Sequence, residues 1–376
     1  MIYLDNAATT KPSKEAAEAM LKTAECFGNP SSLHGLGLEA EKLISASRER
    51  IAGMLGGDKR HLYFTSGGTE ANNMAVFGAA QAKKRAGNRV ITSQIEHPSV
   101  LESFTRLEEL GFDVAYAPVG ADGRVDVERF RELLTPDTIL VSIMHVNNET
   151  GVIQPVEELA ELTHKAAKGS VFHCDCVQSF GKLPVNVRRM GIDMVTVSAH
   201  KIHGFKGCGA LYTGGVKLTP IIYGGEQQNG VRPGTENIGG IAAFGAAAEN
   251  CSCKPDNMRR LRSLMRELLT DSIPDIKING SDEYNSGSVL NVSFLGIKAE
   301  ILLHSLERHR IYVSTGSACS SHKPQPSHVL RAMGLAPKEV EGAVRFSFSE
   351  YTTEEEIREA CEKIAAEAAL IRKYMR

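Results

Sequence analysis

The sequence has little net charge, no long apolar run and no signal-peptide pattern at its start. Its 43 basic and 45 acidic residues leave a formal net charge of -2, which gives no broad electrostatic attraction to nucleic acid or to an anionic membrane. The most apolar stretch, IGGIAAFGAAA at 238–248, is too short to span a bilayer, so we expect a packed helix. The opening MIYLDNAATT lacks a basic segment followed by an apolar one. We therefore expect a cytoplasmic protein with eight reduced cysteines.

Repeats, low-complexity linkers and paired metal-ligand motifs are also missing. One segment, HCDCVQS, nevertheless gathers a histidine, two cysteines and an aspartate. If this segment is a strand, His173 and Asp175 lie on one face, whereas Cys174 and Cys176 lean to the other. No second C-x-x-C or H-x-x-x-H motif completes a zinc site, so we expect no metal. Asp175, near the end of its strand, either faces a ligand or caps the next turn.

Short β-rich runs alternate with amphipathic segments from about residue 60 to about residue 250. This rhythm predicts an α/β fold with a mainly parallel sheet covered by helices. The expected strands are 61–66, 89–93, 112–119, 138–146, 170–175 and 193–200, and the expected helices are 69–84, 100–110, 126–134 and 155–167. Asp126 is expected to cap its helix. After residue 250 the order changes to a polar helix, three strands interrupted by a helix, and a charged final helix, which predicts a smaller α+β domain.

Polar segments follow several of these strands, where ligands bind in such sheets. TSGGTEAN (65–72) has two glycines before a helix, and free N–H groups there suit a phosphate. His97, in IEHPSV, precedes a proline at a turn, from which an imidazole can stack on a flat ligand or move protons. Taken alone, an ordinary glycine-rich turn and a hydrogen-bonded histidine are the simpler interpretations.

A lysine follows the valine-rich strand in VSAHKIHGFKG (197–207). Partial burial at the mouth of a sheet favours the neutral amine, which is the form that attacks carbonyls, although a solvated surface lysine is the simpler interpretation of Lys201 alone. The combination is more specific. A phosphate loop, a ring-stacking group, an acidic partner for a pyridine nitrogen and a Schiff-base lysine together suit pyridoxal 5'-phosphate.

At this point the sequence closely resembles the cysteine desulfurases, a family in the class V aminotransferase group of fold-type I pyridoxal phosphate enzymes. The resemblance covers nearly the whole chain in collinear order. It is carried by YLDNAATT, FGNPSSLHG, TSGGTEANN, EHPSV, SIMHVNNETG, HCDCVQSFGKLP, SAHKIHG, VRPGTEN, STGSACSS, PSHVLRAMG and VRFSFS. The resemblance implies a seven-stranded large domain that binds the cofactor (residues 15–250) and a small domain (residues 1–14 and 251–376) that carries a catalytic cysteine loop.

The resemblance also implies a role for each site residue. Lys201 would bind the cofactor covalently and Asp175 would pair with its pyridine nitrogen. The other expected contacts are Gln178 to the ring hydroxyl, His97 stacked on the ring, Gly68, Thr69, Ser198 and His200 on the phosphate, Thr235 on the phosphate of the neighbouring subunit, Asn148 near the ring hydroxyl and substrate, and Arg345 on the substrate carboxylate. The Thr235 contact implies a homodimer with its sites at the subunit interface.

Cys319, in STGSACSS, matches the family's sulfur-accepting nucleophile. The implied reaction removes sulfur from L-cysteine and leaves L-alanine and a persulfide on Cys319, because only the thiolate is a good nucleophile. His97 would assist at the substrate thiol, and Lys201 would move the Cα proton. An acceptor protein would then take the sulfur for iron–sulfur clusters, tRNA thiolation or cofactors.

Four positions depart from the family pattern. Phe205 stands where proline is frequent, Asn229 stands where a basic residue is common, and Cys176 and Cys208 replace commoner apolar residues. None of these removes a catalytic role.

Other functions stay open at this stage. A selenocysteine lyase shares the fold and cofactor and differs in its substrate. An aminotransferase would not need Cys319, a non-catalytic sulfur carrier or scaffold would not need the cofactor residues, and a metallohydrolase would need a metal.

Overall fold

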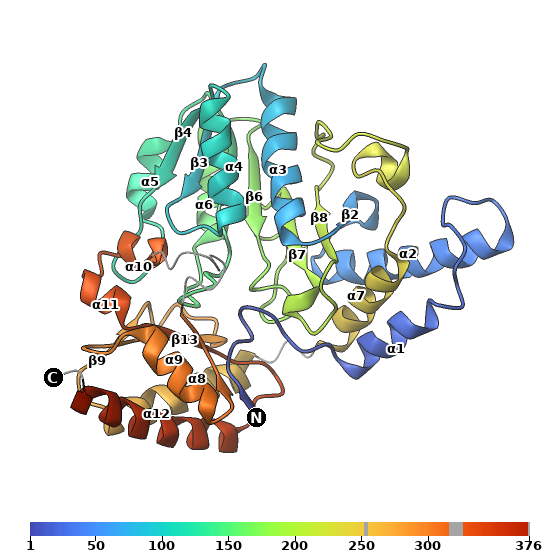
Figure 1. Cartoon of the computed structure of the whole chain (residues 1–376). Coiled ribbons are helices and arrows are strands. Elements are labelled where there is room, and N and C mark those ends of the chain that lie inside the picture. The colour runs from blue at the N-terminus through green and yellow to red at the C-terminus, as the bar shows by residue number, and fades with distance from the viewer. Residues whose placement is uncertain (252–254, 316–325, 375–376) are drawn as a thin grey trace.

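A seven-stranded sheet forms the centre of the larger of two structural units (Figure 1). The computed structural model describes residues 1–251, 255–315 and 326–374. The sheet runs in the order β2 (Leu62–Thr65), β8 (Gly209–Tyr212), β7 (Met194–Ser198), β6 (Val171–Asp175), β5 (Thr138–Ser142), β3 (Arg89–Ser93), β4 (Asp113–Ala117). β8 runs opposite to the other six strands, so its pairs with β2 and β7 are antiparallel and the remaining pairs are parallel. The predicted α/β class with a mainly parallel sheet is therefore confirmed.

Helices cover both faces of this sheet. One face carries α3 (Gly68–Lys83) and α4 (Pro98–Glu109). The other carries α2 (Gly35–Met54), α5 (Val127–Leu133), α6 (Val156–Ala166) and α7 (Ile238–Asn250), and α1 (Lys14–Lys22) packs on α7. Three short turns of 3-10 helix complete this part: η1 (Lys59–His61), η2 (Ala199–Lys201) and η3 (Gln227–Gly230).

The central strands are apolar on both sides because both faces are covered. Neighbouring residues such as Val90 and Ile91 on β3 pack into different cores, the first against α3 and α4 and the second against the helices of the other face. Local signals set the helix starts: the side chain of Asp126 accepts the N–H of Arg129 at 3.1 Å, which confirms the predicted cap.

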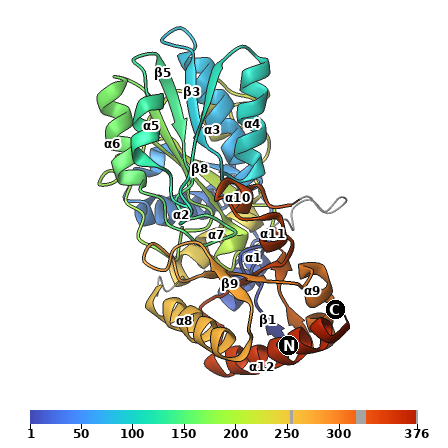
Figure 2. The same cartoon turned by 90° about the vertical axis from the view of Figure 1, so that its left-hand side faces the viewer.

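A smaller α+β unit lies beneath this sheet (Figures 1 and 2). Its antiparallel sheet runs in the order β12 (Ser314–Thr315), β13 (Ala343–Ser347), β10 (Val289–Phe294), β9 (Ile276–Asn279). The helices of this part are α8 (Pro255–Ser272), α9 (Ala299–Arg308), α10 (His328–Ala332), α11 (Pro337–Glu341) and α12 (Glu354–Tyr374). The unit has its own core, to which α8, α9 and α12 contribute. The predicted smaller α+β unit is confirmed, and its boundaries at residues 14 and 250 stay a prediction.

The start of the chain belongs to the smaller unit. β1 (Ile2–Tyr3) pairs in parallel with β11 (Ile311–Tyr312), and both Ile2 and Leu4 lie in the core of that unit. Figure 1 shows this first segment, in blue, rising from beside α12 toward the larger sheet. Residues that are remote in the sequence therefore meet between the two sheets.

One expected strand is shorter than its apolar pattern indicates. The run 138–146 predicts a single strand, but β5 ends at Ser142. The backbone beyond it still donates from Ile143 to His173 and from His145 to Asp175, and it then turns back through a bridge between Val146 and Ile153. Burial explains the apolar run without a longer strand. None of the helices in the described ranges is both long and apolar enough to cross a membrane.

A buried carboxyl group joins the loops after β3 and β5. Glu96 Oε1 accepts the hydroxyl of Ser93 at 2.5 Å and the N–H of Met144 at 3.0 Å. The side chain is fully buried, and this burial raises the pKa of Glu96 to about 8, against the hydrogen bonds, which lower it. Glu96 is therefore mostly protonated in the folded protein at neutral pH.

A close helix contact gives the first prediction. A Cβ atom on Gly245 of α7 would lie 2.4 Å from Ser47 Oγ and 2.9 Å from Ser47 Cα on α2. We expect Gly245→Ala to lower the free energy of unfolding by about 1–3 kcal/mol through overpacking, as measured by urea denaturation. Gly53→Ala is the matched control: its Cβ meets nothing within 4 Å, and it should raise stability by about 0.5–1 kcal/mol. Equal effects of the two changes would contradict the packing argument.

The buried Glu96 gives a prediction on pH. Its pKa is raised on folding, so the folded state holds a proton that the unfolded state has lost, and stability falls as pH rises toward 8. This group should lower the free energy of unfolding by up to about 1.4 kcal/mol per pH unit between pH 6 and pH 8. Glu96→Gln should flatten that slope in urea titrations at each pH. Identical slopes in both proteins would show that Glu96 does not titrate in this range.

Candidate active site

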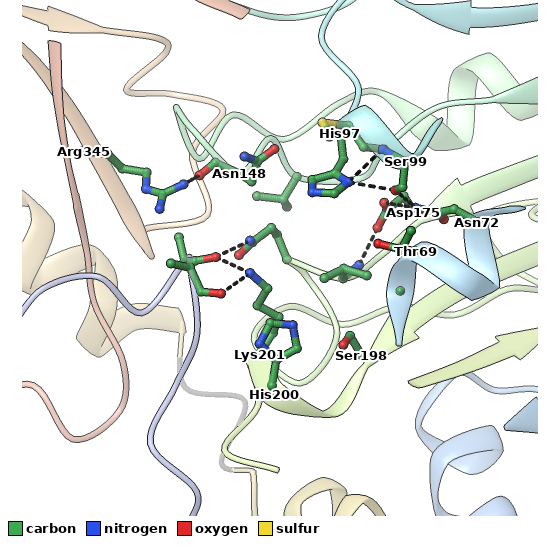
Figure 3. A pocket seen from close by; sticks show the side chains of 17 residues that line it. Thr69, Asn72, His97, Ser99, Asn148, Asp175, Ser198, His200, Lys201 and Arg345 are labelled. Atoms are coloured by element: carbon green, nitrogen blue, oxygen red, sulfur yellow. Dashed lines mark hydrogen bonds between the residues drawn. The ribbon is translucent and has the colours of Figure 1, made fainter. Parts of the chain in front are cut away.

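A cavity of about 210 Å³ lies beyond the carboxyl ends of β6 and β7 (Figure 3). Its walls come from the larger sheet, from the first residues of the chain and from β13. The lining residues are Ala7, Ala8, Gly68, Thr69, Asn72, His97, Ser99, Met144, Val146, Asn148, Asp175, Val177, Gln178, Ser198, His200, Lys201 and Arg345.

Asp175 ends β6 with both carboxylate oxygens occupied. Oδ1 accepts the N–H of Val177 at 2.9 Å, and Oδ2 accepts Asn72 Nδ2 at 2.8 Å. The residue is buried. The carboxylate is thus held rigidly inside the cavity, where its charge can stabilise a protonated nitrogen of a ligand.

Asn72 connects Asp175 to His97 through Ser99. The same Asn72 Nδ2 donates to Ser99 Oγ at 2.9 Å, and Ser99 Oγ lies 2.8 Å from His97 Nδ1 (Figure 3). The Ser99 N–H also donates to His97 Nδ1 at 3.2 Å. Because Nδ1 accepts, the network assigns the proton of the neutral ring to Nε2.

The surroundings of His97 keep its imidazole neutral. Burial lowers the pKa of His97 below the usual histidine value, and the charges of Lys201 and His328 lower it further, against the opposing effect of Asp175. His97 also caps α4, whose first residue is a proline, so the ring is fixed at the cavity wall. A neutral, fixed imidazole suits stacking on a flat ring.

The start of α3 forms an anion cradle. Its N-cap, Gly67, provides no side-chain hydrogen bond to the first turn, so those N–H groups remain for a ligand. A Cβ atom on Gly68 would lie 2.9 Å from Val177 Cγ2, so glycine allows this close approach. Ser198 Oγ is buried and has no hydrogen-bond partner among the described residues. Buried hydroxyls are normally paired, and a bound phosphate fits this donor.

Lys201 reaches the cavity from η2, directly after β7. Its Nζ donates to the carbonyl oxygens of Ala7 and Ala8 in the first segment of the chain. The carbonyl of Ala7 also accepts Gln178 Nε2 at 2.9 Å, and Gln178 Oε1 accepts Lys182 Nζ at 3.3 Å. Lysine and glutamine thus meet at one backbone carbonyl.

Arg345 closes the opposite wall from β13. Its Nη1 donates to the carbonyl oxygen of Asn148 at 2.9 Å and its Nη2 to Asp5 Oδ1 at 3.0 Å. Its side chain is buried. A guanidinium held in this way inside a cavity suits a carboxylate ligand.

Ten of the twelve predicted site residues line this one cavity: Gly68, Thr69, His97, Asn148, Asp175, Gln178, Ser198, His200, Lys201 and Arg345. Thr235 does not; it lines a separate hollow with Ser66, Cys208 and Arg232. Cys319 lies outside the described residues.

Several residues of the site could not be identified from the sequence. Asn72 and Ser99 occur inside the motifs TSGGTEANN and EHPSV, yet no spacing indicates that they meet across α3 and α4. Asp5, Ala7 and Ala8 belong to the motif YLDNAATT, but the resemblance assigns them no role. Their position depends on how the first segment packs between the sheets.

The cysteines of HCDCVQS point away from this chemistry. Cys174 and Cys176 are buried in the core of the other sheet face, with their sulfur atoms 3.6 Å apart. Within the described ranges, no group of three or more His, Cys, Asp or Glu side chains is arranged to hold a metal ion. Asp175, Val177 and Gln178 are the residues of this motif that line the cavity.

The sequence matches known proteins over almost its full length. The profile of the aminotransferase class-V family matches residues 2–359. A cysteine desulfurase of Trichormus azollae is 42% identical over 365 residues, which are 95% of this chain and 90% of that protein. The putative cysteine desulfurase IscS 1 of Bacillus subtilis is 40% identical over 373 residues, or 97% of both chains.

Solved structures agree with this assignment. A NifS-like protein superposes with a TM-score of 0.92 at 36% identity and covers 98% of this chain and 99% of its own. SspA in complex with cysteine superposes with a TM-score of 0.83 at 34% identity, over 94% of this chain and all of its own. The chain therefore belongs to the class-V aminotransferase family and, within it, to the cysteine desulfurases.

Proposed function

We propose that this protein is a pyridoxal 5'-phosphate-dependent cysteine desulfurase. The observation that carries this proposal is the convergence of Lys201, Asp175, His97 and Arg345 on a single cavity beside the start of α3. The activity named for its relatives and the cysteine bound by SspA support the choice of L-cysteine as substrate.

The residues of the cavity match the parts of this cofactor. The unpartnered Ser198 hydroxyl and the N–H groups at Gly68 and Thr69 would hold the phosphate, together with His200. Asp175 would pair with the pyridine nitrogen, Gln178 and Asn148 would reach the ring hydroxyl, His97 would lie on the ring, and Lys201 would bind the cofactor covalently. When bound, the cofactor supplies an electron sink for the substrate's Cα.

The side chains of the protein would supply the remaining steps. Arg345 would bind the α-carboxylate of L-cysteine and orient it. Lys201, once its amine is released, would move the Cα proton, and neutral His97 would exchange a proton with the substrate thiol. The Cys319 thiolate would attack the substrate sulfur: a sulfur–sulfur bond forms, the carbon–sulfur bond breaks, and its electron pair stays with carbon, which is protonated to give L-alanine.

The persulfide on Cys319 would pass its sulfur to an acceptor protein or a reductant. We infer a homodimer in the cytoplasm as the working form. Exposed apolar side chains support a subunit contact in this region: Phe27 and Leu33 lie between α1 and α2, Leu36 and Leu38 at the start of α2, and Tyr223 before η3. Thr235 would reach the neighbouring subunit's phosphate from this side.

Spectroscopy and product analysis test the function. The purified protein with pyridoxal phosphate should absorb at roughly 400 nm, and L-cysteine with a thiol reductant should yield equal amounts of L-alanine and sulfide. Cys319→Ala should keep the band and lose sulfide formation by about 100-fold or more, whereas Lys201→Ala should lose both. Cys26→Ala, which changes a partly buried cysteine outside the cavity, should act like wild type. A Cys319→Ala protein with full activity would refute the assigned nucleophile.

Asn72 and Asn73 form a matched pair for testing the Asp175 network. Asn72 holds Asp175 and Ser99, whereas Asn73 Nδ2, among the residues described, donates to the carbonyl of Thr69 in its own helix. We expect Asn72→Ala to weaken cofactor binding, or to lower kcat, about ten-fold, because a hydrogen bond to a charged group is lost. Asn73→Ala should change neither by more than about two-fold. Cofactor dissociation followed by absorbance measures the difference, and equal values for the two variants would rule out the network's role.

A further inference from the structure

The guanidinium of Arg345 has N–H donors that its hydrogen bonds to Asn148 and Asp5 do not use. Of its five N–H donors, the bonds to Asn148 and Asp5 use two, so three remain. One of them, on Nε, is buried and has no acceptor among the residues described. Because buried donors are normally paired, this arrangement indicates that a ligand completes the site.

Asp5 is itself fixed by the smaller sheet. The first segment runs beside β13, and Asp5 bridges to Ser347, two residues beyond Arg345. Asn6 Nδ2 donates to the Ser347 carbonyl at 2.9 Å, and Ser347 Oγ accepts the N–H of Ala7 at 2.8 Å. Residues two apart on a strand share a face, so this docking sets Asp5 against Arg345.

A second buried acidic side chain lies within electrostatic reach of Arg345. Glu149 is buried, and its Oε2 accepts the hydroxyl of Ser327 at 2.6 Å. Burial raises the pKa of Glu149 to about 7, and the charge of Arg345 is close enough to act against this rise. Without Asp5, a desolvated guanidinium would turn toward Glu149 for a counter-charge, because a buried charge without a partner is unfavourable. The N–H groups of Arg345 that would bind the substrate would then point away from it.

We propose that Asp5 is a positioning residue that holds Arg345 in the orientation in which its free N–H groups bind the carboxylate of the substrate. The proposal rests on the desulfurase function above. Asp5 also partly neutralises Arg345, which weakens its attraction for a carboxylate. Orientation outweighs this effect because the guanidinium is buried and fixed at two nitrogens, so an unpaired Arg345 would relocate rather than gain attraction.

Steady-state kinetics separate positioning from general damage. Asp5→Ala should raise the KM for L-cysteine about ten-fold, with kcat within about three-fold of wild type. Asp5→Asn keeps an acceptor oxygen without the charge and should raise KM about three-fold. A fall in kcat at unchanged KM in Asp5→Ala, or a wild-type KM in Asp5→Asn, would overturn the proposal. The second variant decides the question if the first does not fold.

Asp282→Ala is the matched control. Asp282 pairs with Arg262, which is as buried as Arg345, at 2.7 Å, and with Arg266 at 2.6 Å. Neither arginine lines the cavity. This variant should lose stability in urea and keep the KM of wild type. A KM raised as much as in Asp5→Ala would show that any broken arginine pair has this effect, and would overturn the proposal.

Binding of L-alanine and of ethylamine, which lacks the carboxylate, separates this inference from the proposed function. By calorimetry, wild type should prefer L-alanine, and Asp5→Asn should lose about three-fold of that preference. If wild type forms no L-alanine from L-cysteine, the proposed function fails, but this comparison still tests Asp5. No preference for L-alanine in wild type, or an unchanged preference in Asp5→Asn, would overturn the inference.

Discussion

The parallel pairing of β6 with β7 is the constraint on which the site depends. In register, Asp175 lies opposite Thr196, and the next residues of the second strand lead through Ser198 directly into the turn that carries Lys201. Parallel strands end at the same edge of a sheet, so a carboxylate and an amine are delivered to one place by backbone hydrogen bonds. Both strands are buried on both faces, so packing under the covering helices also holds them in place.

The charged groups at that edge of the sheet are buried or partly buried and therefore need partners. Each of the charged groups that line the cavity has a partner that fixes it: Asp175 is held by Asn72 and Val177, Lys201 by two carbonyl oxygens, and Arg345 by Asp5 and Asn148. For two nearby groups, burial outweighs the interactions that favour the charged form: it raises the pKa of Glu96 and lowers the pKa of His97. The same low-polarity surroundings would strengthen every contact made to a bound cofactor.

The first ten residues connect the two units at this point. They pair with the smaller unit through β1, Ser347 and the Asp5–Arg345 ion pair, and the carbonyl groups of Ala7 and Ala8 accept hydrogen bonds from residues of the larger one. Thr10 continues the contact by donating its N–H to the carbonyl of His200. A segment without helix or long strand can therefore be as well ordered as the sheets, because tertiary partners satisfy its backbone.

The sequence by itself determined the α/β class, the smaller α+β unit, the strand that ends in Asp175 and ten of the residues around the cavity. The fold class, the smaller unit and the strand follow from local periodicity and turn residues, whereas the full set of ten cavity residues follows from the resemblance of the motifs to those of the cysteine desulfurases. Tertiary structure alone decided the chain from Asp175 through Asn72 and Ser99 to His97, the hold of Asp5 on Arg345, and the separation of Thr235 from the cavity. Such contacts join residues up to 340 positions apart. No local pattern encodes them, because they depend on how whole elements pack.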